Sequence, residues 1–420
     1  MKRQTHVPHP LSEVVANRLS FAQRPRPRGL KAYASDRIPP NPPPLVKAGA
    51  LCYNGAKAEK EKGGFAMKRL VIDRQAVVNN LKTIREKAGK AKIYAVLTGD
   101  ACGAGLLEMA GLLHQHGVTR FAVSEPGDAA KLRKAGLVEE EILMLRSTVN
   151  RQELEQLLDL NVICSIGSSE AGMALNSLAE SRSTVAEAHI QVDSGMGYGG
   201  FVISEPDKIL AAFQNLQNVA ISGIYTQFQS SSTNEKAITA QLDEFTQVVR
   251  QVHRAGFETG TVHAAGSFST LRYDFARFDA VRVGSALLGR CKRTKNDGLQ
   301  RVGYCEATIE DIRWLPAGHT VGYESPVKIK KPTRVATLAV GYQNGLSVSR
   351  PRKKGLFARI FPPKNDDLAV RVGNQRAKII GRVGAIETLI DVTSLKCAGG
   401  DWVQIELDPM YAQDMPKEYR

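Results

Sequence analysis

Short apolar runs alternate with amphipathic stretches along the first two thirds of the chain. The run at residues 93–97 is apolar throughout, as in a strand covered on both faces, and it leads through small residues and glycines into the amphipathic stretch 106–116. This pattern predicts a strand that feeds a helix through an open turn. In α/β folds such turns carry the chemistry, because side chains there face solvent while the backbone stays rigid.

The alternation contains eight apolar runs, which is the strand count of a TIM barrel. Helical stretches at 74–87, 128–135, 151–158 and 237–253 follow or separate the runs. A doubly wound open sheet is the alternative, but eight repeats without Gly-x-Gly-x-x-Gly at the first turn argue against it. The predicted barrel strands lie near residues 93–97, 121–123, 142–145, 162–164, 189–192, 221–225, 261–263 and 280–283.

Beyond about Leu299 the pattern changes to strands joined by turns that contain glycine and proline, with little helix between them. The sequence therefore predicts a (β/α)8 barrel over residues 67–299, opened by a short strand at 67–73, and an all-β domain over residues 300–420. The strands predicted for the second domain lie at 304–314, 335–340, 377–383, 388–392 and 402–407.

Residues 1–66 differ from the rest in composition. They hold nine of the nineteen prolines and bury too little apolar surface to offset chain entropy, so we expect a disordered, basic, proline-rich extension. Its twelve Lys and Arg against four Asp and Glu contribute +8 of the net charge of +15. The surplus elsewhere is modest, so nucleic-acid binding is not expected of the folded part, and weak contact of the extension with RNA or anionic lipid is the alternative.

The chain carries no sign of a membrane span, a metal site or a disulfide framework. No apolar run approaches the roughly 20 residues that span a bilayer. The cysteines lack Cys-x-x-Cys spacing, which indicates free thiols in a cytoplasmic protein. The six are Cys52, Cys102, Cys164, Cys291, Cys305 and Cys397.

The turn after the first barrel strand resembles a known motif. Residues 95–105, Ala-Val-Leu-Thr-Gly-Asp-Ala-Cys-Gly-Ala-Gly, are similar to the pyridoxal-phosphate (PLP) lysine motif of alanine racemases, Ala-Val-Val/Leu-Lys-Ala/Gly-Asn/Asp-Ala-Tyr-Gly-His/Leu-Gly. On that pattern Thr98 stands where the family has its Schiff-base lysine. Cys102 stands where the family has a tyrosine that holds the cofactor phosphate. A PLP barrel followed by a β domain is also the alanine racemase architecture, so the resemblance covers about residues 67–420.

The resemblance extends to the parts that would hold the cofactor. Residues 279–289 resemble Asp-x-Val-Arg-x-Gly-x-Ala-Leu-Tyr/Leu-Gly. This implies that Arg282 faces the pyridine nitrogen of PLP and that Gly284 and Ser285 offer backbone N–H groups to its phosphate. The sequence His-Ala-Ala-Gly-Ser that ends at Ser267 resembles His-x-Ala-Asn-Ser, with the serine as a phosphate ligand. For each fragment alone, an ordinary barrel strand and its turn is the alternative.

Two tyrosines of the second domain also match. Residues 318–323 resemble Gly-x-x-Val-Ser/Gly-Tyr-Gly, which implies that Tyr323 is the second catalytic base. In the family this tyrosine acts in the partner subunit, so the resemblance implies a head-to-tail homodimer. Residues 340–345 resemble Val-Gly-Tyr-x-Asp/Asn-Gly and imply that Tyr342 lies near the cofactor and the substrate. A tyrosine packed in a strand is the plainer reading of either residue alone.

The departures from the family pattern fall on reacting positions, while the framework around them is kept. Random drift would change both alike, so the pattern suggests that selection for the chemistry was lifted or that the site was remade. Besides Thr98 and Cys102, the departures are Tyr198 for arginine, Gln227 for histidine, Gly266 for asparagine, Ala385 for a substrate-contacting methionine and Ile386 for aspartate.

Threonine cannot supply the positioned amine that Schiff-base chemistry needs, and loss of one base from a two-base mechanism removes several decades of rate. Lys90 and Lys92 precede the strand and are expected at the opposite end of the barrel. The resemblance therefore implies an alanine-racemase-like protein, from a family that interconverts L- and D-alanine, that is impaired or a pseudoenzyme without covalently attached PLP. Two alternatives stay open: an active amino-acid racemase with a remade site, and a protein that binds PLP or an amino acid noncovalently at Ser267, Gly284 and Arg282.

Overall fold

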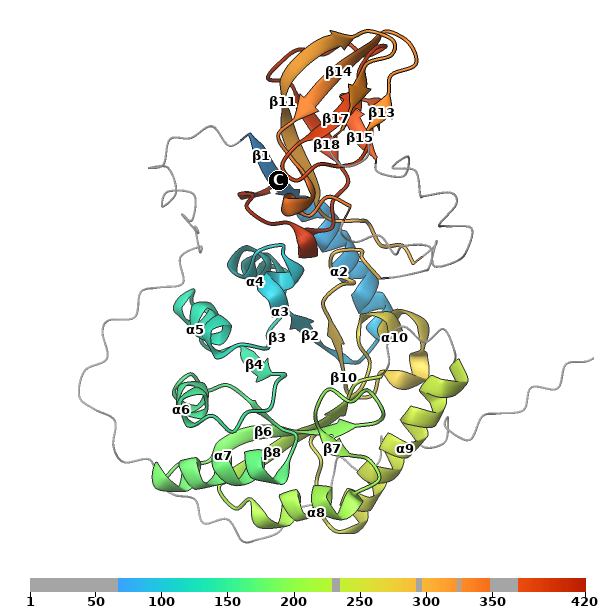
Figure 1. Cartoon of the computed structure of the whole chain (residues 1–420). Coiled ribbons are helices and arrows are strands. Elements are labelled where there is room, and N and C mark those ends of the chain that lie inside the picture. Colours follow the sequence, from blue (N-terminus) through green and yellow to red (C-terminus); the bar gives the residue numbers. More distant parts are fainter. Residues whose placement is uncertain (1–66, 229–234, 292–296, 323–325, 348–368) are drawn as a thin grey trace, which may run out of the picture. The chain divides into compact units, whose positions relative to one another are not determined.

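Eight parallel strands build the sheet of the first domain, and helices connect them in the alternation that the apolar pattern predicts (Figure 1). The strands are hydrogen-bonded in the order β4-β3-β2-β10-β9-β8-β6-β5, and an isolated bridge between Leu143 and Ile163 joins β4 to the segment before β5. The predicted TIM-type fold is therefore confirmed as a nearly closed parallel barrel. Its strands are β2 (Lys92–Val96), β3 (Arg120–Val123), β4 (Glu141–Met144), β5 (Cys164–Ile166), β6 (Ala186–Asp193), β8 (Val219–Thr226), β9 (Thr261–His263) and β10 (Ala280–Val283), and a short β7 (Phe201–Val202) pairs with β6.

The structure is a computed structural model. The predicted extension at residues 1–66 and the predicted base Tyr323 lie outside the described residues. Within the described ranges, no helix combines the length and the apolar character that crossing a membrane requires. The same ranges hold no group of three or more His, Cys, Asp or Glu residues suited to a metal ion. The described residues are 67–228, 235–291, 297–322, 326–347 and 369–420.

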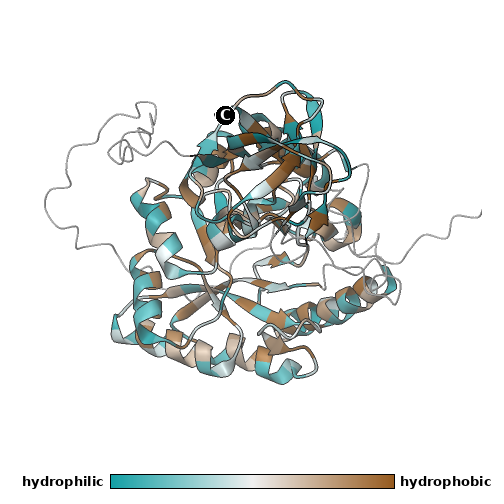
Figure 2. Cartoon of the chain, turned by 45° about the horizontal axis from the view of Figure 1, so that its top comes forward, coloured by the Kyte–Doolittle hydropathy of each residue, from teal (hydrophilic) through white to brown (hydrophobic). Residues whose placement is uncertain are grey.

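Helices pack against the barrel strands through their apolar faces. The longest, α9 (Glu235–Arg254), buries residues three or four positions apart, such as Ile238, Leu242 and Phe245, as the helical period requires. In Figure 2, apolar residues gather on the strands and polar residues on the outward helix faces. The remaining barrel helices are α2 (Arg74–Ala88), α4 (Leu106–Gln115), α5 (Pro126–Lys134), α6 (Arg151–Asp159), α7 (Ser169–Ser181), α8 (Pro206–Asn215) and α10 (Ser267–Arg272), and a 3-10 turn η3 (Asp274–Ala276) follows.

The first strand of the described chain, β1 (Lys68–Ile72), belongs to the sheet of the second domain. It pairs antiparallel with β11 (Tyr304–Leu315) and parallel with β19 (Lys417–Tyr419). The sequence places this strand at the start of the barrel segment, because an apolar run does not specify its partner. Both ends of the described chain therefore lie in one sheet, on either side of the barrel sequence.

The second domain is an antiparallel β barrel, as the all-β prediction requires. Its sheet runs β14-β17-β16-β15-β18-β11-β1-β19, and a further pairing of β14 with β11 closes the ring. The remaining elements are β12 (Thr320–Val321), β13 (Val327–Lys328), β14 (Thr333–Leu338), η4 (Tyr342–Asn344), β15 (Val370–Val372), β16 (Gln375–Ile379), β17 (Thr388–Asp391), β18 (Trp402–Ile405) and η6 (Pro409–Tyr411).

Candidate functional site at the carboxyl ends of the barrel strands

The backbone after β2 forms one turn of left-handed helix, α3 (Thr98–Cys102). Asp100, Ala101 and Cys102 have φ values of 57°, 55° and 55°, a region that residues with a Cβ rarely adopt. The sequence predicts an open turn between a strand and a helix here. The order of strand, turn and helix is as predicted, but the turn is left-handed, which these residue types do not signal. Each such residue costs about 1–2 kcal/mol, so surrounding contacts must hold the conformation.

Hydrogen bonds connect the turn to α4. The N–H of Gly103 donates to the carbonyl of Gly99 across 2.8 Å. The N–H of Leu106 donates to the Asp100 carboxylate, also across 2.8 Å, which satisfies one free donor at the start of α4. Thr98 opens the turn at the carboxyl end of β2, where its side chain is half-buried. The predicted lysine position therefore lies on a rigid turn at the end of a barrel strand.

Arg282 on β10 is the buried charge of the site. Its residue is only 4% exposed, and its guanidinium donates to Nδ1 of His263 across 2.6 Å, to Oε1 of Gln227 across 2.6 Å and to the carbonyl of Thr226 across 2.7 Å. All three acceptors are neutral, and burial lowers the pKa of Arg282 to about 10. The Tyr225 ring lies 4.9 Å from the guanidinium carbon. Gln227 thus supplies an acceptor for Arg282 where the family pattern has a histidine.

Two buried histidines, His263 and His189, form a chain of hydrogen bonds that starts at Arg282. A guanidinium only donates, so Nδ1 of His263 accepts and its proton lies on Nε2. That Nε2–H then donates to Nδ1 of His189 on β6 across 2.9 Å. Burial lowers the pKa of both rings, to about 3 for His189, and the Arg282 charge lowers them further. The motifs did not single out His189, although it is a histidine within an apolar strand.

The predicted phosphate cradle forms at the start of α10 and the end of β10. Oγ of Ser267 accepts from the N–H of Gly284 across 3.0 Å and from the N–H of Ala286 across 3.2 Å. Oγ of Ser285 lies 3.7 Å from Sγ of Cys291. The structure thus brings Ser267, Gly284 and Ser285 together. The N–H of Gly284, which the resemblance assigns to a phosphate, here donates to the hydroxyl oxygen of Ser267.

A cysteine lies on each side of this cradle. A Cβ placed on Gly284 would lie 3.7 Å from Sγ of Cys102 and 3.1 Å from the carbonyl oxygen of Val96, so α3 and the end of β2 border the cradle directly. Burial raises the pKa of the Cys102 and Cys291 thiols, and the Asp408 carboxylate raises that of Cys102 further. Both are therefore neutral thiols near pH 7. Cys291 was not predicted, and its place two residues after the matched motif is the only sequence signal.

The other predicted residues lie outside this cluster. Tyr342 in η4 is 52% exposed, and its N–H donates to the carbonyl of Gly384 in its own domain across 2.9 Å. No hydrogen bond among the described residues joins Tyr342 to the cradle. Tyr198, which replaces the family arginine, is 83% exposed in the glycine-rich loop after β6. Ile386 is 57% exposed beside Ala385.

A parallel barrel followed by an antiparallel β domain, with a buried arginine and a serine cradle at the strand ends, defines a class of two-domain barrel proteins. Residues 72–291 match the family described as alanine racemase, N-terminal domain. Residues 302–416 match the family described as alanine racemase, C-terminal domain. The chain belongs to the alanine racemase family, which confirms the resemblance found in the motifs.

Individual relatives agree with this assignment. The chain is 30% identical over 334 residues to the alanine racemase of Beutenbergia cavernae, covering 77% of this chain and 84% of the relative. It is also 30% identical over 315 residues to the broad specificity amino-acid racemase of Vibrio vulnificus, covering 74% and 72%. A solved structure of alanine racemase from Bartonella henselae with covalently bound pyridoxal phosphate shares the fold, with a TM-score of 0.72, 24% identity and coverage of 84% of this chain and 100% of that chain.

Proposed function

We propose that this chain is a pseudoenzyme of the alanine racemase family that has lost most or all racemisation and holds a PLP-type ligand without a covalent bond. The observation that supports the proposal is Thr98, at the carboxyl end of β2 where the family motif has its lysine. A hydroxyl on a β-branched stem neither condenses with an aldehyde to form a stable link nor returns a proton as an amine does.

The residues of the cradle fit the phosphate and the pyridine ring of such a ligand. When bound, PLP supplies an electron sink for the electron pair that is left on the α-carbon of an amino acid when its α-proton is removed. Ser267, Ser285 and the adjoining backbone would bind the phosphate through neutral donors at the start of α10. Gly284 keeps open the space beside Val96, because a Cβ there would lie only 3.1 Å from the Val96 carbonyl oxygen, while its contact with Cys102 would be an ordinary 3.7 Å.

Arg282 would orient the ring nitrogen. Its two terminal nitrogens are held by His263, Gln227 and the Thr226 carbonyl, so the plane of the guanidinium is fixed. Its Nε–H makes no hydrogen bond to a residue that the structure describes, and it is the donor left for a ligand. A permanent cation at this position keeps a pyridine nitrogen unprotonated, which limits the electron sink.

The residues present do not fit covalent attachment. Lys92 begins β2, and its own N–H pairs with the Asp279 carbonyl at the amino end of the barrel strands. It therefore lies a full strand length from Thr98. The side chain of Cys102 is also shorter than that of the family tyrosine. Its neutral thiol would therefore not reach the phosphate that the tyrosine hydroxyl contacts in the family.

We also propose a cytoplasmic homodimer that recognises a small amino acid, because the family motif places Tyr323 in the site of a partner subunit. Light scattering at micromolar concentration tests this. The mass of a dimer supports the proposal, and the mass of a monomer removes the role assigned to Tyr323.

The experiment that tests the function compares the native chain, Thr98→Lys and the size-matched Thr98→Gln. Each is incubated with PLP and divided in two: D-alanine formation is assayed in one portion before any reduction, and the other portion is reduced with borohydride and measured by intact mass. We expect a mass increase only for Thr98→Lys. A covalent adduct on the native chain, with activity, would instead support an active racemase with a remade site and would place the amine at another lysine.

A further inference from the structure

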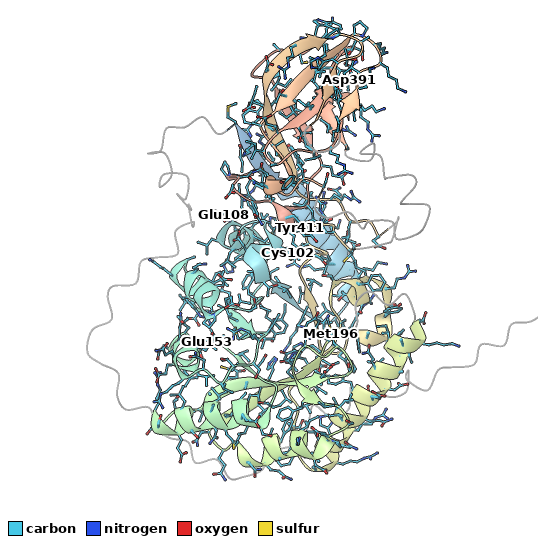
Figure 3. The ribbon with its side chains drawn as sticks, in the orientation of Figure 1. Cys102, Glu108, Glu153, Met196, Asp391 and Tyr411 are labelled. Atoms are coloured by element: carbon cyan, nitrogen blue, oxygen red, sulfur yellow. The ribbon has the colours of Figure 1, made fainter. Side chains whose placement is uncertain are left out.

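The last residues of the chain lie directly against the left-handed turn. The 3-10 turn η6 (Pro409–Tyr411) contacts α3, and Cys102 and Tyr411 mark the two facing elements in Figure 3. A Cβ on Gly103 would lie within 2.5 Å of the carbonyl carbon of Pro409. Gly103 itself has a φ of 85°, so both its backbone conformation and this close approach require glycine.

Two side chains of β19 also contact the turn. Nζ of Lys417 is paired with the carboxylate of Asp100. The hydroxyl of Tyr419 donates to the carbonyl of Ala104 across 3.0 Å. Lys417 and Tyr419 are two residues apart on a strand, so their side chains point to the same side. Burial raises the pKa of Tyr419, so this donor keeps its proton across the physiological range.

The same C-terminal segment, residues 407–420, contacts the other side of the cradle. The guanidinium of Arg290 donates to the carbonyl of Leu407 across 2.6 Å. Arg290 directly precedes Cys291, whose thiol faces Ser285. The C-terminal segment thus contacts both walls of the candidate site, α3 on one side and, on the other, the segment after β10 that contains Arg290.

The turn needs such contacts because its conformation is unfavourable. Asp100, Ala101 and Cys102 together cost several kcal/mol at their positive φ angles. Strained backbone persists only where the surrounding structure over-determines it. The Asp100 carboxylate and the Ala104 carbonyl, the two groups that Lys417 and Tyr419 contact, lie at either end of the strained residues.

We propose that Lys417 and Tyr419 are positioning residues that hold the left-handed turn, and with it Thr98 and Cys102, in the shape of the ligand site. These contacts connect the turn to the sheet of the second domain, because β19 is anchored to β1 by backbone pairing of Leu70 with Lys417 and Ile72 with Tyr419. This inference goes beyond the proposed function and holds for whichever ligand the cradle takes.

The Cys102 thiol reports directly on this turn. We would alkylate the full-length chain with iodoacetamide under native conditions and follow each cysteine by peptide mass spectrometry. Cys164 on β5 is 2% exposed in the barrel core and serves as the internal reference for opening of the whole domain. No ligand is needed, so the outcome is independent of whether PLP binds.

The test variants are Tyr419→Phe, Lys417→Met and the double variant, and the matched control is Tyr304→Phe, at a tyrosine of β11 that lies in a paired strand. We expect Tyr419→Phe to raise the Cys102 rate about fivefold, as loss of one hydrogen bond predicts, with the Cys164 rate unchanged. For Lys417→Met we expect a smaller rise in the Cys102 rate, about twofold, because the Lys417–Asp100 ion pair is partly exposed. Lys417→Arg keeps the charge and is expected to show the native rate.

Two results would overturn the proposal. The first is a Cys102 rate in the double variant that equals the rate in Tyr304→Phe, which would mean that the contacts do not hold the turn. The second is a Cys164 rate that rises in the same proportion as the Cys102 rate, which would reduce Lys417 and Tyr419 to ordinary contributors to global stability.

Discussion

The guanidinium of Arg282 and the imidazole of His263 face each other across 2.6 Å, and this contact sets the protonation of the barrel interior. Because Arg282 only donates, His263 is neutral with its proton on Nε2, and this Nε2–H donates a hydrogen bond to Nδ1 of His189. The barrel interior near the site therefore contains one buried positive charge surrounded by neutral acceptors. Such an arrangement is costly to disturb, since removing an acceptor leaves a buried charged donor unpaired.

The first prediction concerns His263. His263→Leu keeps the bulk of the ring but leaves an N–H of Arg282 without its acceptor, and we expect a loss of about 1–3 kcal/mol in the free energy of unfolding. Denaturant unfolding at pH 7 measures it. His116→Leu, at an exposed position at the end of α4, is the matched control and is expected within about 0.5 kcal/mol of the native chain. Equal effects of the two variants would contradict the role of His263.

The second prediction is a pH dependence of stability. Burial lowers the pKa of His189 in the folded chain to about 3, below its ordinary value of 6.5. The unfolded chain therefore binds more protons in this window, and stability is present above pH 6.5 and is lost as the pH falls toward 3. For this one residue the loss between pH 7 and pH 5 is about 2 kcal/mol.

Measuring unfolding free energies at pH 7 and pH 5 for the native chain and for His189→Gln tests this. The variant should lose clearly less stability over the interval. The salt-bridged Glu306 contributes little there, because its lowered pKa places its loss of stability below pH 4.5, the ordinary pKa of its side chain. The same pH dependence in both proteins would show that His189 is not buried in its neutral form.

The third prediction concerns Gly103. Gly103→Ala adds a Cβ against the Pro409 carbonyl at a φ of 85°, and we expect a loss of at least about 2 kcal/mol from strain and displacement. Gly127→Ala in α5 meets no atom within 4 Å and is expected to be neutral or stabilising by up to about 1 kcal/mol. Thermal unfolding of both variants checks the pair. A Gly103→Ala protein as stable as Gly127→Ala would mean that the turn does not approach Pro409.

The barrel was predictable because its strands are continuous apolar runs separated by helical periods. Seven of the eight predicted runs coincide closely with observed strands, and the run at 162–164 overlaps β5 only at Cys164. Helices α7 and α8 lie between predicted strands, where the alternation expects helices, but they were not among the helical stretches named from the sequence. The partners of β1 were missed because an apolar run carries no information about which strand it joins.

The site shows the same division between local pattern and tertiary packing. The motifs predicted the positions of Ser267, Arg282 and Gly284, and the structure places them at adjoining strand ends. They did not predict the left-handed turn at Asp100, which depends on contacts with residues more than 300 positions away in the sequence, such as Lys417. They also did not predict the hydrogen bond from Gly284 to Ser267, because a motif fixes positions and not donor directions.

The rate of D-alanine formation from L-alanine by the native chain with saturating PLP decides whether this chain is a pseudoenzyme. We predict a rate no greater than that of PLP alone, because Thr98 provides no amine and no base at the end of β2. A rate well above that of PLP alone, abolished by borohydride treatment of the loaded protein, would contradict the pseudoenzyme assignment and show that another residue performs the chemistry of the missing lysine.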